Sequence, residues 1–287
     1  MTGTLQSSRT AVMVCQGRAA ADGLLAPDRF ADPVAMTLLR AAEREPVQWV
    51  RDDARPRPWP QRLDFETVRA HAEMIVPRTV AIDDAVRAAT HPQLVILGAG
   101  LDGRAWRMPE FTVFEVDHPA SQQDKRDRAT DLPGRPPSYV AVNLGHDPLG
   151  TALAAAGHRR DLPTTWVWEG VVPYLTPEQV AATVAQVAEC SASAGRLIVN
   201  YQRPMPSAAL GRLVSRALTA SAGRRSVWSR EPWRSTWTPE AMAELLGRHG
   251  FHVATDVHLM EVAEQVGSPT GHRRSLQHGR IAVADRS

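Results

Sequence analysis

A glycine turn between two strand-like runs constrains the fold of this chain more than any other feature. Residues 93–117 read QLVILGAGLDGRAWRMPEFTVFEVD. The apolar run Leu94–Leu97 leads into the turn Gly98–Gly103, and a second run of β-branched and aromatic residues, Phe111–Val116, ends on Asp117. A strand, a glycine turn, a helix and a second strand closed by an acid build the nucleotide pocket of an α/β fold, because the turn lets the backbone approach the ligand and the acid accepts ribose hydroxyls.

The turn fits the glycine pattern of dinucleotide-binding proteins, with Gly98, Gly100 and Gly103 at the expected spacing. Two features argue against a dinucleotide. Asp102 lies where a diphosphate would meet the helix N-terminus, and its carboxylate would repel an anion. The following helix has barely one turn before Pro109, whereas a phosphate-binding helix is usually long enough to develop a dipole. S-adenosylmethionine carries no phosphate, and Asp102 is free to face its cation, so the sequence favours this methyl donor.

Two motifs in this stretch connect the chain to a known family. LGAGLDGRAWRM followed by FEVDHP resembles the leucine carboxyl methyltransferase family, including bacterial O-methyltransferases of polyketide-type secondary metabolism. The resemblance covers about residues 10–254, and the family typically has Thr where this chain has Gly103. It implies an α/β fold with the Rossmann-like sheet of class I methyltransferases, mostly parallel with an antiparallel last strand, together with an N-terminal helical lid. It also implies S-adenosyl-L-methionine as the cofactor.

Apolar alternation and β-branched residues predict seven strands after the first ninety residues. Their expected ranges are 94–97, 111–116, 138–142, 164–170 and 195–201, with a closing pair at 251–259 and 277–284 joined by a linker at 267–274. Prolines, arginines and tryptophans interrupt the alternation of strands and helices between residues 202 and 237. We therefore expect a methyltransferase core at 91–287 with an acceptor-side insertion at about 202–237.

The first ninety residues are predicted to be mainly helical and to lie outside this sheet. Helical spacing covers residues 11–22, 33–45 and 65–89. The segment 51–60 holds three prolines without a periodic pattern and is predicted to be a loop, and the third helix is expected to be interrupted near Pro77. The sequence therefore predicts that residues 1–90 form a lid over the nucleotide site.

Arg78 is the lid residue predicted to contact the methionine part of the donor. The resembling family uses the arginine of an Arg-Thr pair at this place to bind the donor's carboxylate, which implies the same role for Arg78. A guanidinium that binds in bidentate fashion is also the best partner for a free carboxylate. The alternative is an arginine on a solvated helix surface. Asp83 and Asp84, further along the same helix, are interpreted as first-turn and surface acids.

Three further candidates follow predicted strand ends, where the ligands of an open α/β sheet bind. His118 follows the ribose-binding acid and is a candidate contact for the adenine edge, with helix capping or simple exposure as alternatives. Asn143 stands where the family usually has an aspartate that accepts from the adenine amino group, and its amide oxygen can still accept without charge. The family's Glu-Gly pair implies that Glu169 meets the donor's amino group or lies close to the methyl group.

These arguments give two sets of candidate site residues. The cofactor-binding set is Arg78, Gly98, Ala99, Gly100, Asp117, His118, Asn143, Leu144 and Glu169. The acceptor-binding set is Tyr174, Tyr201, Arg203 and Trp233. Tyr174 matches the aromatic residue that follows the family's Glu-Gly pair. Packing in the hydrophobic core is an equal alternative for the tryptophans of the insertion.

Composition and charge exclude several classes of protein. The formal net charge of +2 is too small to indicate a nucleic-acid-binding protein. No apolar run approaches the ~20 residues that cross a bilayer, and the N-terminus has no apolar signal core, so we expect a cytoplasmic protein. Cys15 and Cys190 lack metal-ligand spacing and are interpreted as reduced core thiols, with no metal expected. The assembly is expected to be a monomer or a homodimer.

One further bias of the composition is the near absence of lysine. Of 33 basic residues only Lys125 is a lysine, a bias that we attribute to a GC-rich genome.

The predicted reaction is the in-line displacement of the donor's methyl group by an oxygen nucleophile of a small-molecule acceptor. Proximity and alignment supply most of the rate of such a displacement. A carboxylate acceptor is already anionic near neutral pH, whereas a hydroxyl acceptor needs a base. His118, His249 and Glu169 are candidates for that base, but the sequence assigns none, and the catalytic residues remain unknown. Carboxyl methylation, the family's best-known chemistry, is slightly favoured.

Two alternatives compete with this interpretation. A nicotinamide-dependent oxidoreductase predicts a turn that accepts a pyrophosphate and a Tyr-x-x-x-Lys or comparable hydride-transfer site, but the chain has Asp102 in the turn and Lys125 as its only lysine. A non-catalytic donor-binding protein on a methyltransferase fold is the second alternative, because Gly103 and Asn143 both depart from the family pattern.

Overall fold

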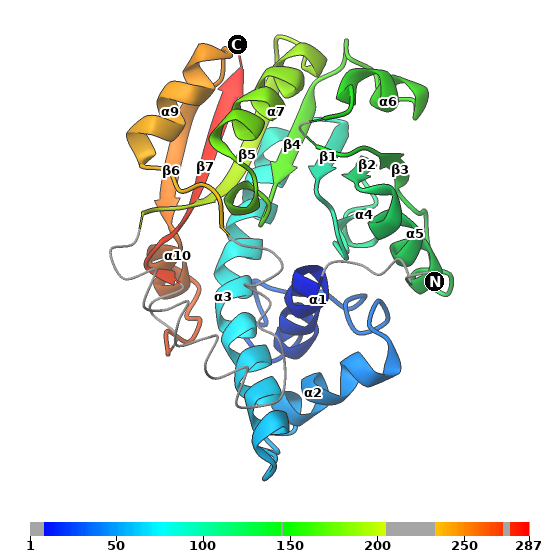
Figure 1. Ribbon diagram of the computed structural model, residues 1–287, viewed down its shortest axis with the longest axis vertical. Coiled ribbons are helices and arrows are strands. Elements are labelled where there is room, and N and C mark those ends of the chain that lie inside the picture. Colours follow the sequence, from blue (N-terminus) through cyan, green and yellow to red (C-terminus); the bar gives the residue numbers. More distant parts are fainter. Residues whose placement is uncertain (1–8, 145, 205–232, 272–275, 287) are drawn as a thin grey trace.

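A seven-stranded sheet forms the centre of the molecule (Figure 1). The computed structural model describes residues 9–144, 146–204, 233–271 and 276–286. The strands are β1 (Gln93–Leu97), β2 (Thr112–Asp117), β3 (Ser138–Ala141), β4 (Thr164–Trp168), β5 (Gly195–Gln202), β6 (His252–His258) and β7 (Gly279–Arg286). Their order in the sheet is β3-β2-β1-β4-β5-β7-β6, with β3 to β5 parallel and β7 antiparallel to both of its neighbours. The predicted fold, mostly parallel with an antiparallel end, is confirmed.

Helices cover both faces of the sheet. Their bounds are α1 (Arg9–Ala21), α2 (Ala41–Arg51), α3 (Trp59–Ala89), α4 (Arg104–Arg107), α5 (Pro119–Arg128), α6 (Leu149–Ala155), the 3-10 turn η1 (Val172–Tyr174), α7 (Pro177–Cys190), α9 (Pro239–Arg248) and α10 (Leu259–Gln265). The central strands β1 and β4 are buried at every residue, as expected when both faces are covered. Threonine N-caps followed by proline start α7 and α9, because the proline needs no hydrogen-bond acceptor in the first turn.

Alternate residues of each strand enter two different hydrophobic clusters. Val95 and Leu97 of β1 pack with α6, α7 and α9, whereas Leu94 and Ile96 pack with α3, α4 and α10. Trp166 and Trp168 of β4 belong to the first cluster and Val167 to the second. This period of two is the geometry of a pleated strand with a core on each face.

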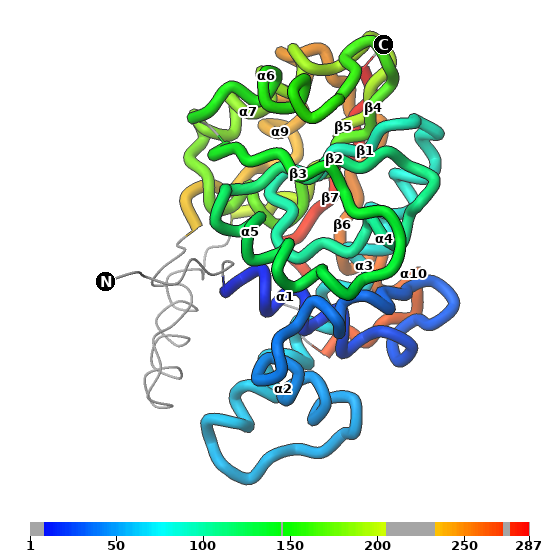
Figure 2. Tube along the Cα trace, turned by 90° about the vertical axis from the view of Figure 1, so that its right-hand side faces the viewer, coloured from blue at the N-terminus to red at the C-terminus, as the bar shows by residue number. Residues whose placement is uncertain are grey.

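A third cluster forms the N-terminal part of the molecule. It joins α1 and α2 to the first half of α3, through residues such as Cys15, Val47 and Val76. Figures 1 and 2 both show α1 and α2 below the sheet, beyond the carboxyl ends of its parallel strands. The second half of α3 packs on the sheet itself through Ile82 and Val86. One continuous helix therefore belongs to both parts, and no break in packing separates them near residue 90.

Some helix predictions for the N-terminal part were wrong. Residues 33–39 form turns, and the helix predicted to begin at Pro33 begins instead at Ala41 and runs to Arg51. The interruption near Pro77 is absent, since α3 continues through this buried proline. Val76 on one side of it and Ile82 on the other are fully buried in different clusters, and packing at both ends outweighs the missing backbone donor.

Two short helices escaped the sequence analysis. Helix α6 has only seven residues, and α10 begins at the last residue of the predicted strand 251–259 and ends before the predicted linker at 267–274. His258 caps α10, accepting the backbone N–H of Met260, so Leu259 begins a helix. The predicted loop at 51–60 is shorter than expected, because α3 already begins at Trp59. Most of the insertion at 202–237 and part of the linker at 267–274 lie outside the described residues.

The structure gives a physical reason for the glycine at position 103. A Cβ added to Gly103 would lie 2.6 Å from Cγ2 of Val34 and 2.8 Å from Oδ1 of Asp32. Both side chains come from the turn segment before α2, so the N-terminal part packs directly on the glycine turn. The threonine of the resembling family would overlap with this segment.

We predict that Gly103→Thr lowers the free energy of unfolding by about 1–3 kcal/mol, because the added side chain overpacks the contact with Asp32 and Val34. Urea denaturation followed by circular dichroism measures this change. Gly247→Ala in α9 is the matched control, since nothing lies within 4 Å of a Cβ at that position, and it should be neutral or slightly stabilising. Equal stability of the Gly103→Thr variant and the wild type would contradict the tight packing.

Candidate functional site

The predicted cofactor residues gather at the carboxyl ends of the parallel strands. Gly98 follows β1, Asp117 ends β2, Asn143 lies two residues after β3, and Glu169 follows β4. Since β1 to β4 are neighbours in the sheet, these four positions share one edge. Arg78 reaches the same edge from α3.

The glycine turn has the backbone geometry that its sequence predicts. Gly98 and Gly100 have φ angles of +67° and +50°, a region that side chains disfavour. A Cβ on Gly98 would lie 2.3 Å from Cγ2 of Val171, and one on Gly100 would lie 3.0 Å from Cβ of Ala11 in α1. The turn therefore lies between the loop after β4 and the first helix, with no room for side chains.

Asp117 faces this turn. Its Oδ2 accepts the backbone N–H of Gly100 at 2.6 Å, and its Oδ1 accepts the backbone N–H of His118 at 2.6 Å. Burial raises the pKa of Asp117, and the two backbone donors oppose that rise. A carboxylate has about four acceptor positions, so two remain for further donors. A ribose diol supplies two such donors.

Arg78, Glu169 and Arg104 form a connected ionic bridge. Nε of Arg78 donates to Oε1 of Glu169 at 2.8 Å, and Nη1 of Arg104 donates to Oε2 of the same carboxylate at 2.8 Å. The Arg78 and Glu169 side chains are each 7% exposed, so the alternative of a solvated helix arginine is wrong for Arg78. Burial raises the pKa of Glu169, but Arg104 and then Arg78 lower it more, and the group stays ionised.

Arg104 is shared by further carboxylates. Its Nε donates to Asp83 at 2.7 Å, and its Nη1 also donates to Asp102. Asp83 in turn accepts from Nη1 of Arg107 at 2.8 Å. The interpretation of Asp83 as a first-turn or surface acid was therefore wrong, since its side chain is buried in this network. Asp102 accepts from the Arg104 side chain and backbone, so in this structure it does not face an open site.

The ionic network continues into the N-terminal part. Asp32 lies 2.9 Å from Nε of Arg18 and 3.6 Å from Nε of Arg107, and the Arg18 guanidinium also donates to the carbonyl of Leu101 in the glycine turn. Burial raises the pKa of Asp32, and the two arginines oppose this rise. Four carboxylates thus meet four guanidinium groups: Asp32, Asp83, Asp102 and Glu169 with Arg18, Arg78, Arg104 and Arg107.

Lys125, in α5, connects the glycine turn to β2. Its ammonium donates to Oε2 of Glu115 at 2.5 Å and to the carbonyl of Asp102 at 2.7 Å, and it lies 5.6 Å from the ring centre of Trp106. Burial raises the pKa of Glu115 to about 7, against the opposing charge of Lys125. The only lysine of the chain thus joins α5, β2 and the turn, with 2% of its side chain exposed.

The remaining predicted cofactor residues are more exposed. Nδ1 of His118 accepts the backbone N–H of Ala120 at 3.2 Å, so His118 caps α5, one of the two alternatives to an adenine contact. Asn143 is exposed, and its backbone N–H donates to Asp147 at 2.8 Å. Leu144 packs at the margin of the cluster on the α6–α7 face.

Two of the predicted acceptor residues, Tyr174 and Trp233, lie on segments that are hydrogen-bonded to each other. The backbone N–H groups of Arg234 and Ser235 donate to the carbonyl of Pro173, so Trp233 and Tyr174 lie on adjacent segments beside the Glu169 loop. Arg203 is exposed, and its backbone N–H donates to His278.

The structure corrects the prediction for Tyr201. This side chain is completely buried in the core, and its hydroxyl donates to Asp256 at 2.5 Å. The β5 sequence places Tyr201 on the covered face, because its neighbour two residues earlier, Val199, belongs to the same hydrophobic cluster. Tyr201 is therefore a core residue and not an acceptor contact.

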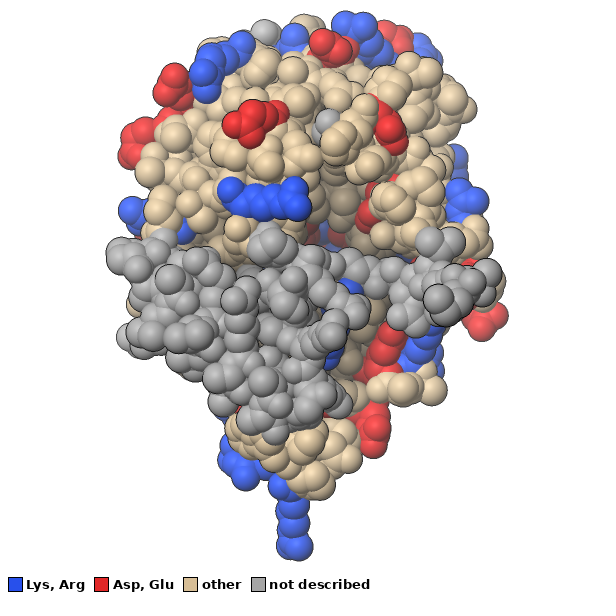
Figure 3. Space-filling view, in the orientation of Figure 1, with Lys and Arg blue, Asp and Glu red and all other residues tan. Residues whose placement is uncertain are grey.

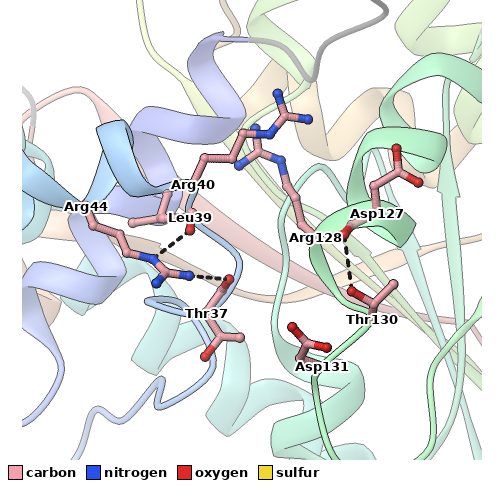
Figure 4. Close-up of a pocket in the computed structure, with 8 residues that line it drawn as sticks. All are labelled: Thr37, Leu39, Arg40, Arg44, Asp127, Arg128, Thr130 and Asp131. Carbon is pink, nitrogen blue, oxygen red and sulfur yellow. Dashed lines mark hydrogen bonds between the residues drawn. The ribbon is translucent and has the colours of Figure 1, made fainter.

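Two cavities lie outside this arrangement. The cavity in Figure 4, of about 220 Å³, is lined by Thr37, Leu39, Arg40, Arg44, Asp127, Arg128, Thr130 and Asp131, from the segment before α2 and the end of α5. A second, of about 550 Å³, includes His249, Arg248 and Arg286 near the amino end of β5. His249 is thus at the end of the sheet opposite Glu169, which removes it as a candidate base for methyl transfer.

The formal net charge of the chain is +2, and the charged side chains on the surface are distributed as this small value suggests. In Figure 3, acidic and basic side chains are interspersed on the upper part of the face shown.

The helices of the described residues include none that is long and apolar enough to cross a membrane. Within the same residues, no group of three or more His, Cys, Asp or Glu side chains could hold a metal ion. Cys15 and Cys190 are both buried free thiols.

Arg104, Asp83, Asp32 and Lys125 are the site residues that the sequence analysis missed. Arg104 lies within the motif stretch 93–117, but two of its three acidic partners are 21 and 65 residues away in the sequence. Lys125 could have been singled out from the sequence, because it is the only lysine among 33 basic residues.

Known proteins were compared with the chain by sequence and by fold. The model of the family described as leucine carboxyl methyltransferase matches residues 11–188. A Streptomyces coelicolor protein, named as a candidate S-adenosyl-L-methionine-dependent methyltransferase, is 34% identical over 255 residues, which cover 84% of this chain and 81% of the relative. A Mycobacterium avium protein of the same name is 32% identical over 278 residues, covering 86% and 87%.

Solved structures support the fold. The crystal structure of a candidate methyltransferase from Thermobifida fusca matches with a TM-score of 0.55 at 13% identity, and the match covers 99% of this chain and 96% of the other. At this identity the likeness concerns the fold alone.

We predict that Lys125→Met lowers the free energy of unfolding by about 3–5 kcal/mol, because it leaves the Glu115 carboxylate buried without its partner. Urea denaturation at neutral pH measures the change. The double variant Lys125→Met/Glu115→Gln removes both charges and should recover much of the loss. A Lys125→Met variant as stable as the wild type would show that the ammonium does not stabilise the turn.

Proposed function

The chain belongs to the leucine carboxyl methyltransferase family and is an S-adenosylmethionine-dependent methyltransferase, and we propose that it methylates an oxygen atom of a small-molecule acceptor. The family match covers both the glycine turn and Glu169. The observation that carries the donor site is the position of Asp117, whose carboxylate is ordered by the backbone of the glycine turn and retains acceptor positions for a ribose diol.

The residues present fit this cofactor. Gly98 and Gly100 adopt positive φ angles that side chains disfavour and pack closely against Val171 and Ala11, which fixes the backbone of the turn beside Asp117. Asp102 is paired with Arg104, so its charge no longer argues against a diphosphate, but α4 has only four residues, too few to develop the dipole that binds one. S-adenosylmethionine supplies, when bound, a methyl group on a positively charged sulfur, ready for displacement. The nicotinamide alternative has no comparable support from the family or the turn.

We assign the donor contacts as part of this proposal. Asp117 accepts the ribose hydroxyls, and Arg78 binds the carboxylate of the methionine part. His118, Asn143 and Leu144 border the adenine, with the His118 ring limited by its role as a helix cap. Residues 1–90 act as the lid, supported by the approach of Ala11 to Gly100.

The acceptor is proposed to lie beside Glu169, near Tyr174 and Trp233. A carboxylate acceptor remains slightly favoured over a hydroxyl, because none of the candidate bases has the geometry of a base. Both oxygens of Glu169 are occupied by arginines, Nδ1 of His118 accepts from the backbone, and His249 lies at the other end of the sheet. A carboxylate is ionised near neutral pH and needs no base, so alignment alone carries the reaction.

Donor binding tests the first part of the proposal. We predict that S-adenosylmethionine binds the wild type in the micromolar range and that Asp117→Ala weakens binding at least about tenfold, because two hydrogen bonds to a charged group are lost. Isothermal titration calorimetry measures both affinities, with NADH as the contrasting ligand. Binding of NADH without binding of S-adenosylmethionine would overturn the proposal, and donor binding without transfer to any acceptor would favour the non-catalytic alternative.

The pH dependence of the rate tests the acceptor class. With carboxylic acids as acceptors, we expect initial rates that change little between about pH 6 and 8, because the acceptor is already ionised. With phenols and no protein base, the rate should rise about tenfold per pH unit below the phenol pKa near 10. Quantifying S-adenosylhomocysteine release gives both profiles. Phenol methylation with a pH-independent rate near neutrality would show that the protein supplies a base and would contradict the preference for carboxylates.

A further inference from the structure

Arg104 lies between three carboxylates, with 1% of its side chain exposed. Its Nε and Nη1 reach Asp83, Asp102 and Glu169 at hydrogen-bond distance. Burial disfavours the charge of Arg104, but Asp102, Asp83 and Glu169 more than offset this effect and hold its pKa well above the ordinary value. Arg104 is thus a permanent cation in a fixed orientation.

Glu169 transmits this orientation to Arg78. Each of its two oxygens accepts from a different guanidinium, Oε1 from Arg78 and Oε2 from Arg104, so the plane of the carboxylate is set from both sides. Glu169 follows Trp168, a completely buried strand residue, and its backbone is fixed by the sheet. The free rotation of the Glu169 side chain is removed mainly by Arg104, which is itself held by two other acids.

Arg78 uses only one of its nitrogens in this bridge. Its Nε donates to Glu169, and its two terminal nitrogens have no hydrogen-bond partner among the described residues. These nitrogens lie about 3.8 Å from the place of a Cβ on Gly170, in the loop where β4 ends. The terminal pair of a guanidinium is the fork that a carboxylate accepts in bidentate fashion.

We infer that Arg104 is a positioning residue of the donor site: it fixes Glu169, and Glu169 aims the terminal nitrogens of Arg78 at the carboxylate of the donor's amino-acid part. The inference rests on the proposed function, because it assumes that the donor binds at this edge of the sheet. It gives Glu169 the role of orienting Arg78, with both of its oxygens already accepting from guanidinium groups.

An arginine is required for this role at position 104. A lysine keeps the charge but presents a compact ammonium instead of a planar fork, so it cannot contact Asp83 and Glu169 in the same geometry. Arg104→Lys therefore loosens Glu169 and Arg78 while preserving the charge balance of the network. The effect should appear only with ligands that have an amino-acid part.

Two ligands separate the amino-acid contacts from the nucleoside contacts. S-adenosylhomocysteine and 5′-methylthioadenosine share the adenosine and the thioether sulfur, but only the first has the ammonium and carboxylate groups. Titration calorimetry of both ligands against the wild type, Arg104→Lys, Arg78→Met and the double variant gives a thermodynamic cycle.

The inference predicts that Arg104→Lys weakens S-adenosylhomocysteine about tenfold and methylthioadenosine less than about twofold. In the Arg78→Met background, Arg104→Lys should weaken S-adenosylhomocysteine by less than about twofold, because the residue through which it acts is gone. Equal losses for both ligands, an unchanged affinity for S-adenosylhomocysteine, or additive effects in the double variant would overturn it.

Glu169→Gln takes the place of Arg104→Lys in the same cycle if the lysine variant does not fold. A glutamine keeps the shape but weakens the bond to both arginines, so the selective loss should again vanish in the Arg78→Met background. Additive losses would instead mean that Glu169 binds the ammonium directly, which overturns the inference.

A control variant and the wild type complete the test. Arg128→Lys perturbs another ion-paired guanidinium, with 4% of its side chain exposed, whose partners Glu43 and Asp124 lie outside the donor site. Its ratio of affinities for the two ligands should equal that of the wild type, and an altered ratio would attribute the Arg104 effect to general loosening. A wild type that binds neither ligand would refute the proposed function itself, whereas normal wild-type binding with an unchanged ratio in Arg104→Lys refutes only the positioning role.

Discussion

Burying four carboxylates together with four guanidinium groups is the constraint on which the rest of this structure depends. Charged groups out of water are costly unless every one is paired, and removal of a single partner leaves an uncompensated charge. The network joins α3, α4, the glycine turn, the end of β4 and the segment before α2. Any arrangement of these elements that separates the ions is therefore disfavoured, so the network selects one geometry for the edge of the sheet where the donor is proposed to bind.

The same constraint explains features that local sequence rules do not. In α3, Arg78 and Asp83 follow Pro77 and pair with ions on other elements, which adds to the hydrophobic packing that keeps the helix continuous through this proline. Gly103 leaves room for Asp32, whose carboxylate completes the ion pairs of Arg18 and Arg107. A threonine at this position would compete with that carboxylate for space, so the departure from the family pattern and the ionic contact to the N-terminal part are two aspects of one packing solution.

Local patterns predicted the sheet well, because its central strands β1 and β4 are buried runs bounded by glycine and proline, and the glycine turn with Asp117 has the expected geometry. The ionic network was not predictable in this way. The partners of Arg104 are separated from it by 2, 21 and 65 residues, and no periodicity connects them. Tyr201 was misassigned for a related reason: an aromatic residue at a strand end has the same local signal whether its hydroxyl meets a ligand or, as here, Asp256.

The placement of Arg78 also limits how the N-terminal part can move during donor exchange. Helix α3 carries Arg78 and Asp83 and packs on the sheet through Ile82 and Val86, so tilting it would break buried ion pairs and expose a hydrophobic cluster at once. Helix α1 is held at the same edge through Arg18, which donates to the carbonyl of Leu101 in the glycine turn and pairs with Asp32, and through its buried residues in the cluster shared with α2 and α3. Displacement of α1 and the segment before α2 would break the ion pairs of Asp32 and part of that cluster as well, so both portions of the N-terminal part are held by contacts of the same kind. Arg78, Glu169 and Arg104 are therefore held together by α3, α4 and the end of β4, which is the benefit of building the proposed donor site on rigid elements.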